Sequence, residues 1–400
     1  MTRISTATMQ QEAVASMLKR QADLSRTQNQ VATGKRIQTP ADDPAGAVRL
    51  QRIQRAIDAN AQYDATATTA TNRLTYEEQA LADLAGSLQR IQELALQANN
   101  SVLDEPTRRL IAAELRTRVD EVIDIGNRSD AGGEYLFAGT RSAVQPFARV
   151  GSGVAYYGDG VTRSVALSGS QRIAVGHTGR EAFQDIPAGN GIFTTAAAPA
   201  NTGTAVIDAG ALLSRPDWIP DNYTVRFIDA ANYEVRNGAN TVIASGAIVA
   251  GTVAAVEFNG VRVTLNGQPA ANDQFNIAPA GRRDLFTTLD RLVGTVESST
   301  TTPAERTQFA TAMAASLNQI TVSLDHVGEI RAEVGARLAA IDSAAGARAE
   351  LDVELQRTRS EIQDVDYAEA VSRMNLQLVG LQAAQQSYAR IAQLSLFDYL

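Results

Sequence analysis

The chain has 400 residues, of which 44% are hydrophobic, 20% charged and 5% aromatic, and its formal net charge is −8. It has no cysteine, which excludes disulfides, thiolate nucleophiles and cysteine metal sites. No basic stripe offers the phosphate contacts that nucleic acid needs, and no apolar run approaches the roughly 18 residues of a membrane span. The length predicts two or three domains, and the N-terminus shows no signal-peptide pattern.

Residues near the N-terminus repeat at alternating steps of three and four, the spacing that forms one stripe along a helix. The stripe consists of Val14, Met17, Gln21, Leu24, Gln28 and Val31. The pattern predicts a helix over residues 5–32 that stops at Gly34, because glycine suits a left-handed cap. Since a stripe needs a partner, we expect it to contact the other end of the chain or a second copy.

Two more helices are predicted in the N-terminal third. Asp43 and Pro44 provide an acidic N-cap and a proline at the first helical position, and the helix they open continues in heptads to about residue 100. Asp104 opens the next helix in the same way, and its apolar positions extend to about residue 127.

The middle of the chain has a different pattern. Prolines and glycines, which break helices, concentrate between residues 141 and 285. Asn237-Gly238 and Asn259-Gly260 each lie between alternating apolar runs, which predicts hairpins. A second β stretch is expected over residues 154–175, with a turn at residues 158–160. The middle therefore predicts an inserted β-rich domain.

Helical patterns return after the insertion. Asp284 begins a short helix that reaches about residue 293. Thr302 and Glu305 form a capping-box pattern with proline between them, and the helix they open extends to about residue 360. This helix matches the second helix in length, so we expect the two to pack along their whole extent, antiparallel or parallel.

The C-terminal stripe repeats the spacing of the first. It consists of Val371, Met374, Leu378, Leu381, Gln385, Tyr388, Ala392 and Ser395. The two stripes together are the expected assembly interface. Polar glutamines at such positions lower stability but fix the register of the helices.

The predicted fold is α+β and multidomain: a long helical bundle or coiled coil built from both termini, with an inserted β-rich domain. The expected domains are terminal helices (1–33 and 365–400), a long-helix bundle (34–140 and 284–364) and a β-rich outer domain (141–283).

The residue types that carry catalysis are scarce. The only histidines are His177 and His326, which favour neither a metal site nor a Ser-His-Asp triad. The paired carboxylates are interpreted as helix caps rather than as acid–base groups or a cation site; they are Asp42, Asp43, Asp364 and Asp366. We therefore expect no enzyme, no catalytic or metal residue and no cofactor.

Two motifs at opposite ends resemble those of bacterial flagellins and hook-associated proteins. TGKRIQTPADDPAG (33–46) is similar to the segment after their first helix, and IQDVDYA (362–368) to their C-terminal junction. GEYLFAGT (133–140) and SLFDYL (395–400) resemble the family member that joins hook and filament; flagellins usually lack the first of these two stretches.

The resemblance implies a structural adaptor at the extracellular hook–filament junction of the flagellum. It would be exported unfolded by the flagellar type III system and would form an annular oligomer with itself. Its other partners would be hook-associated protein 1, flagellin and a cytosolic export chaperone, with no nucleic acid and no membrane. The terminal helices would form the inner tube, the long helices the next shell and the β-rich domain the outside.

Three alternatives stay open at this point. A variant flagellin would share the motifs but would polymerise into long filaments alone. An adhesin or a hydrolase carried in the β insertion would need a cleft with convergent polar groups. A membrane-lying C-terminal helix is disfavoured, because its polar face has few basic residues.

Overall fold

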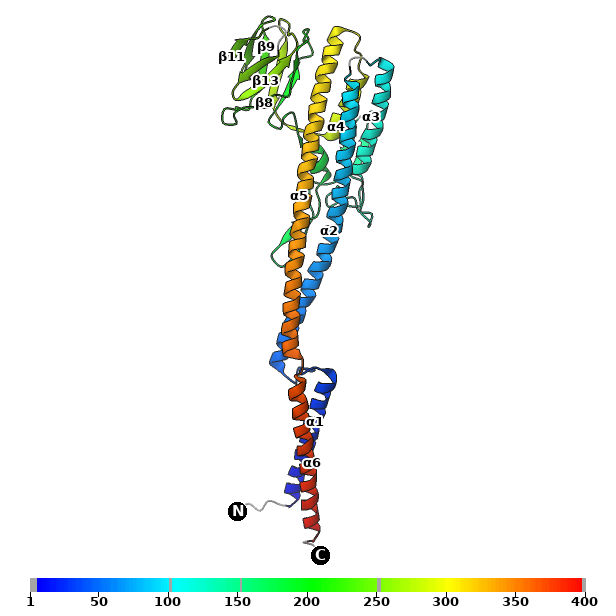
Figure 1. Ribbon diagram of the computed structural model, residues 1–400, viewed down its shortest axis with the longest axis vertical. Coiled ribbons are helices and arrows are strands. Elements are labelled where there is room, and N and C mark those ends of the chain that lie inside the picture. Colours follow the sequence, from blue (N-terminus) through cyan, green and yellow to red (C-terminus); the bar gives the residue numbers. More distant parts are fainter. Residues whose placement is uncertain (1–5, 101–102, 152, 250–252, 398–400) are drawn as a thin grey trace. The chain divides into compact units, whose positions relative to one another are not determined.

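A computed structural model describes residues 6–100, 103–151, 153–249 and 253–397 of the chain. Its helices are α1 (Thr6–Thr33), α2 (Pro44–Ala98), α3 (Glu105–Gly126), the π-helical turn η1 (Arg180–Gln184), α4 (Leu285–Glu297), α5 (Pro303–Gln363) and α6 (Tyr367–Phe397). Long helices from both ends flank a β-rich insert, so the predicted fold class is confirmed (Figure 1). None of the described helices is long and apolar enough to cross a membrane.

The chain forms two compact units. The first consists of Met1–Ala65 with Ser343–Leu400, and the second is Thr66–Asp342. The unit boundaries therefore fall inside α2 and α5.

Local capping explains where the helices begin. The backbone N–H of Thr107 donates to Asp104 Oδ1 at 3.1 Å, which caps α3. At α5 the capping box is reciprocal: the N–H of Thr302 donates to Glu305 Oε2 at 2.9 Å, and the N–H of Glu305 donates to Thr302 Oγ1 at 3.2 Å. These bonds satisfy amides that have no partner inside the helix, and the predicted helix starts are confirmed.

In the second unit the long helices run antiparallel. Gln92 of α2 donates to Thr321 of α5 at 3.1 Å, whereas Glu78, earlier in α2, accepts from Arg331, later in α5, at 2.7 Å. Helices α3 and α4 pack against one another. Fully buried aliphatic side chains fill the space between the helices; they include Leu74, Leu81, Leu84, Leu88, Ile91, Leu115, Val122, Leu289, Leu292, Ile320, Val327 and Val334.

Short antiparallel ribbons lead from the helices into the insert. They are β1 (Phe147–Val150) with β2 (Gly153–Tyr156), β3 (Ser164–Ala166) with β4 (Arg172–Ala174), and β5 (Ile186–Pro187) with β15 (Arg282–Arg283). Their aromatic core joins Phe183 to Phe137 and Phe147 at 5.1 Å between ring centroids, and Phe147 to Phe286 of α4 at 5.0 Å. Because these rings are fully buried, they fix this segment against the helices.

The rest of the insert is a β-sandwich. One sheet has the strand order β11 (Val242–Ala247), β10 (Asn232–Arg236), β9 (Tyr223–Phe227), β14 (Gln274–Pro279), β6 (Phe193–Ala197). The other has the order β12 (Ala254–Phe258), β13 (Val261–Asn266), β7 (Val206–Ile207), with β8 (Ala211–Leu212) also paired to β13. Alternate residues of both sheets share one core, as period-two patterns require.

The turn predictions have mixed outcomes. Phe258 pairs with Val261, so Asn259 and Gly260, both with positive φ, form the predicted two-residue hairpin turn. Asn237-Gly238 instead lies within a longer loop, in which Asn240 takes the left-handed conformation. The stretch 154–175 is two separate ribbons, because β2 pairs backward with β1 rather than across residues 158–160.

Candidate assembly interface

The two ends of the chain meet where α1 and α6 are joined to the long helices. The backbone N–H of Val365 donates to Gly34 O at 3.0 Å, and the N–H of Arg36 donates to Gln363 O at 2.7 Å. Gly34 has φ +72°, so it provides the predicted left-handed cap of α1. A Cβ atom at this glycine would lie only 2.9 Å from the hydroxyl of Tyr367, so a larger residue would meet backbone strain and would also require Tyr367 to shift.

Beyond this joint, α1 and α6 pack against one another as an antiparallel hairpin (Figure 1). Every second residue of each predicted stripe lies on the seam between the two helices. Leu24 is buried and the others on the seam are half-buried; they are Met17, Leu24 and Val31 of α1 and Met374, Leu381 and Tyr388 of α6. The structure therefore brings half of each described stripe together within one chain.

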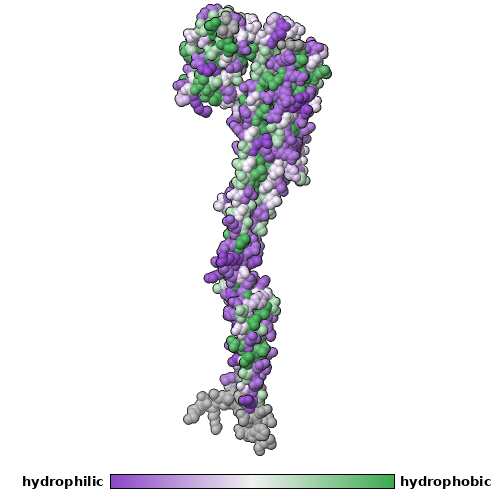
Figure 2. All heavy atoms as spheres, in the orientation of Figure 1, coloured by the Kyte–Doolittle hydropathy of each residue, from purple (hydrophilic) through white to green (hydrophobic). Residues whose placement is uncertain are grey.

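The alternate residues of each stripe are exposed and lie beside the seam. They are Val14, Gln21 and Gln28 of α1 and Val371, Leu378 and Gln385 of α6. Leu18, Leu376 and Val379 add further exposed aliphatic side chains, with exposed fractions of 61% or more. Hydrophobic residues are visible on the surface of this hairpin in Figure 2. We call this surface the hairpin flank.

Part of the seam has no counterpart in the predicted stripes. Four further seam residues lie between the predicted stripe positions. Thr27 and Ala370 are buried, and Gln377 and Ala384 are half-buried. Their small or polar side chains carry little hydrophobic signal, so only their spacing could have identified them. The side chains of Ala392 and Ser395 lie outside those that the structure describes.

The paired carboxylates form caps and turns. Asp42 accepts from the N–H of Thr39 at 2.8 Å and Asp43 from that of Gly46 at 2.9 Å, and these bonds lower the pKa of both carboxyls. Asp366 caps α6 by accepting from the N–H of Ala368 at 2.9 Å, and Ser360 donates to Asp364. Among the described residues no acidic or histidine group has the arrangement of a metal site.

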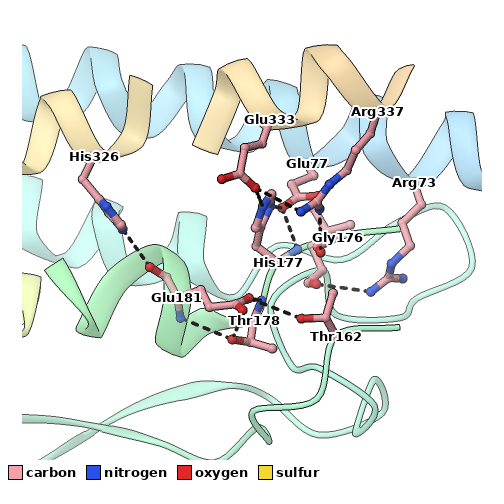
Figure 3. Close-up of polar contacts among 11 residues, drawn as sticks. Arg73, Glu77, Thr162, Gly176, His177, Thr178, Glu181, His326, Glu333 and Arg337 are labelled. Carbon is pink, nitrogen blue, oxygen red and sulfur yellow. Dashed lines mark hydrogen bonds and ion pairs between the residues drawn. The ribbon is translucent and has the colours of Figure 1, made fainter. Parts of the chain in front are cut away.

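In the second unit a buried histidine joins the insert to both long helices (Figure 3). His177 Nδ1 lies 2.8 Å from Glu77 Oε1 of α2, and its Nε2 lies 3.2 Å from Glu333 Oε2 of α5. Arg337 donates to Gly176 O at 3.1 Å and to Glu333 at 3.1 Å. We call these residues the histidine clamp.

The histidine clamp favours a protonated imidazole. Burial by itself lowers the pKa of His177, and the positive charge of Arg337 opposes protonation as well. The hydrogen bond and negative charge of Glu77, together with Glu333, outweigh both effects, so the pKa is raised above 6.5. Sequence reasoning missed this cluster, because its members are far apart in the chain and no local pattern links them.

The motif at residues 133–140 is held from α2 by a buried arginine. Arg73 donates to the carbonyl oxygens of Tyr135 and Leu136 at 3.0 and 3.2 Å and forms an ion pair with Asp130 at 3.2 Å. Phe137 then enters the aromatic core beside Phe183. The motif is therefore structural: it turns the chain from α3 into the insert.

Comparisons with known proteins agree with this architecture. Residues 4–142 match the bacterial flagellin N-terminal helical region, and residues 317–400 match the bacterial flagellin C-terminal helical region. The flagellar hook-associated protein 3 of Salmonella typhimurium is 30% identical over 184 residues. That match spans 46% of this chain and 57% of the relative, a little over half of its length.

Solved structures match more of the chain. The crystal structure of FlgL from Xanthomonas campestris is 32% identical with a TM-score of 0.70, and the match covers 77% of this chain and 99% of that one. The flagellar junction protein FlgL of Legionella pneumophila is 27% identical with a TM-score of 0.70, covering 79% and 100% respectively.

Proposed function

Because the chain belongs to the flagellar hook-associated protein 3 (FlgL) family of bacterial flagellins, we propose that it is a structural, non-enzymatic adaptor at the hook–filament junction. In this role it joins the hook, through hook-associated protein 1, to the flagellin of the filament. It is exported by the flagellar type III system, with a cytosolic chaperone, and forms an annular layer with copies of itself. The absence of cysteine is compatible with export of an unfolded chain.

The observation that carries this proposal is the exposed half of each terminal stripe. The seam residues satisfy the contact between α1 and α6, whereas Val14 of α1 and Val371 and Leu378 of α6 remain 39–42% exposed on the hairpin flank. Burying an aliphatic side chain is worth about 1.5–3 kcal/mol, so a row of them gives neighbouring subunits a reason to associate. We propose that the flank contacts neighbours in the assembled tube.

In the proposed tube, different parts of the chain lie at different distances from the tube axis. Residues 1–33 and 365–400 form the inner tube, residues 34–140 and 284–364 the next shell, and residues 141–283 the outside. In this arrangement the hairpin flank lies at the interface between neighbouring subunits of the inner tube.

The test is complementation of a null strain. We expect the null strain to make hooks without filaments and to shed flagellin into the medium. The double variant V371D/L378D should keep its helical content by circular dichroism but fail to restore filaments, because charge on the flank opposes packing. The matched control is Ile219→Asp, at an aliphatic position of the insert that is 61% exposed, and it should restore them.

Two outcomes would contradict the proposal. If the V371D/L378D variant restored normal filaments, the hairpin flank would not be needed for assembly. Purified wild-type protein that polymerised alone into long filaments would be a filament subunit and not an adaptor.

A further inference from the structure

The second unit contains a cavity at one side of the β-sandwich. Its volume is about 430 Å³, and it lies between the sheet-edge strands β6 and β7 and the N-terminal part of α5. Its size falls in the range of small-molecule sites, which are usually clefts of roughly 300–1,000 Å³. Nothing in the adaptor role proposed above requires a hollow at this place.

Two arginines line the cavity, Arg283 of β15 and Arg291 of α4. Neither side chain has a hydrogen bond or an ion pair with any residue that the structure describes. The acids of α4 have other partners: Asp290 lies 3.8 Å from Arg149, and Glu297 lies 2.5 Å from Arg116. Asp284, which follows Arg283 in the chain, caps α4 by accepting from the N–H of Thr287 at 2.8 Å. The cavity therefore has an excess of positive charge at one place.

The acidic residue in the cavity wall, Asp208, offsets only one of the two arginine charges, so the lining keeps a net positive charge. Asp208 Oδ1 accepts from the backbone N–H groups of Gly210 and Thr264 at 2.9 and 2.8 Å, so this carboxylate is committed to a turn. Burial, and then the charge of Arg291, lower the pKa of Arg283. An anion placed between the two guanidinium groups would offset the burial of the Arg283 charge and the repulsion between Arg283 and Arg291.

The remaining wall has few free donors: among its described amide side chains only Gln308 has no hydrogen bond, whereas Asn201, Asn318 and Gln319 donate to backbone carbonyl oxygens. The hydroxyls of Thr194, Thr195 and Thr311 donate to backbone carbonyl oxygens. Apolar side chains make up much of the rest; they include Ala197, Pro199, Ala205, Ile207, Ala312 and Ala315. This lining suits a compact apolar body better than a sugar, which needs many hydrogen-bond partners.

We propose that this cavity binds a small organic carboxylate. The carboxylate group lies against Arg283 and Arg291, and the apolar body lies against the alanines of β6 and α5. Arginine recognises carboxylates through two parallel N–H donors, and such charge-assisted hydrogen bonds are roughly twice as strong as those between neutral groups.

Benzoate is a suitable probe, and isothermal titration calorimetry of the full chain measures its binding. We expect a Kd of about 1 mM or tighter, and no detectable binding of the neutral isostere benzamide. Arg283→Gln and Arg291→Gln should each weaken benzoate binding by about tenfold or more. Arg215→Gln makes the same charge change at an exposed residue outside the cavity, and it should leave the affinity unchanged.

A second variant tests the cavity without touching its charge. Ala315→Leu places a larger side chain in the wall and should abolish binding, while thermal melting shows that the protein is still folded. The proposal is overturned if benzoate fails to bind the wild-type protein at about 10 mM, if benzamide binds equally well, or if Arg291→Gln, at an exposed position that folding tolerates, leaves the affinity unchanged.

Discussion

Glu77 of α2 accepts two hydrogen bonds from one residue of the insert: the backbone N–H of His177 lies 2.9 Å from Glu77 Oε1, and the imidazole Nδ1 lies 2.8 Å from the same oxygen. Both side chains are almost fully buried. A loop 100 positions away in the sequence is thereby attached to α2, and the negative charge of Glu77 favours the protonated imidazole.

This relationship predicts a pH dependence of stability. Since the folded pKa of His177 is raised above 6.5, its contribution is fully present below that pH and is lost as pH rises through the folded pKa. Each unit of difference between folded and unfolded pKa is worth about 1.4 kcal/mol. Wild-type protein should therefore show a falling free energy of unfolding in urea titrations as pH rises above 6.5 and through the folded pKa of His177.

The variant Glu77→Gln should lose this slope, because a neutral amide no longer raises the pKa of His177. The matched control is Glu78→Gln, the neighbouring carboxylate of α2, whose partner Arg331 stays charged throughout. A slope that survives in Glu77→Gln, or disappears in Glu78→Gln, would assign the pH dependence to other groups.

Arg73 should be far more important than exposed arginines of the same helix. Removing it leaves two backbone carbonyl oxygens without their donor and takes the ion-pair partner from Asp130, and leaving a buried acceptor unpaired costs about 1–3 kcal/mol. Arg73→Leu should lower the free energy of unfolding by that amount. Arg90→Leu removes an exposed ion pair with Glu93 and Glu114 and should cost less than about 1 kcal/mol. Equal effects would show that the motif at residues 133–140 does not depend on Arg73.

Gly34→Ala should loosen the terminal hairpin. An alanine with φ +72° is strained by about 1–2 kcal/mol, and its Cβ would also approach the hydroxyl of Tyr367. Hydrogen exchange should become faster at the amide of Val365, which donates to Gly34. Adding Tyr367→Phe removes the hydroxyl and should recover part of the loss. Exchange that is unchanged in Gly34→Ala would contradict the need for glycine.

The capping box of α5 should be sensitive to acid. Glu305 accepts from the backbone N–H of Thr302 and from nearby hydroxyls, and these bonds lower its pKa from 4.5 to about 2. Its stabilising effect is therefore present above pH 4.5 and is lost as pH falls toward 2. Amide protection in the first turn of α5, taken relative to the intrinsic exchange rate at each pH, should fall over that range. Glu305→Gln should show lower protection at neutral pH and little further loss in acid; a loss as large as that of the wild type would assign the acid effect to other groups.

Much of the fold could be predicted because its determinants are local. A capping box, an N-cap aspartate or an Asn-Gly turn stabilises the backbone within a few residues, so Thr302, Asp104 and Asn259 each indicate an element directly. The prediction of a turn at Asn237-Gly238 was less accurate, because a bulge between Val235 and Arg236 shifts the register of the two strands there.

The packing of α1 against α6 within one chain was predictable only in outline. A heptad repeat specifies a stripe along a helix, but each heptad contains two stripe positions, and the repeat does not say which of the two is buried. Which of them is buried depends on the angle at which the partner helix approaches. In the structure Leu24 and Leu381 lie on the seam, whereas Gln28 and Leu378 are exposed. The exposed half is the part that we propose to contact other subunits.

The sequence by itself determined the helices, their caps, the division into helical ends and a β-rich middle, and the motifs of the family. These depend on periodicity and on contacts between near neighbours. Only the tertiary structure decided the pairing of β14 with β6 and β9, the histidine clamp and the cavity beside Arg283. Each of these joins segments that are distant in the chain, and contact between them depends on how the whole core packs.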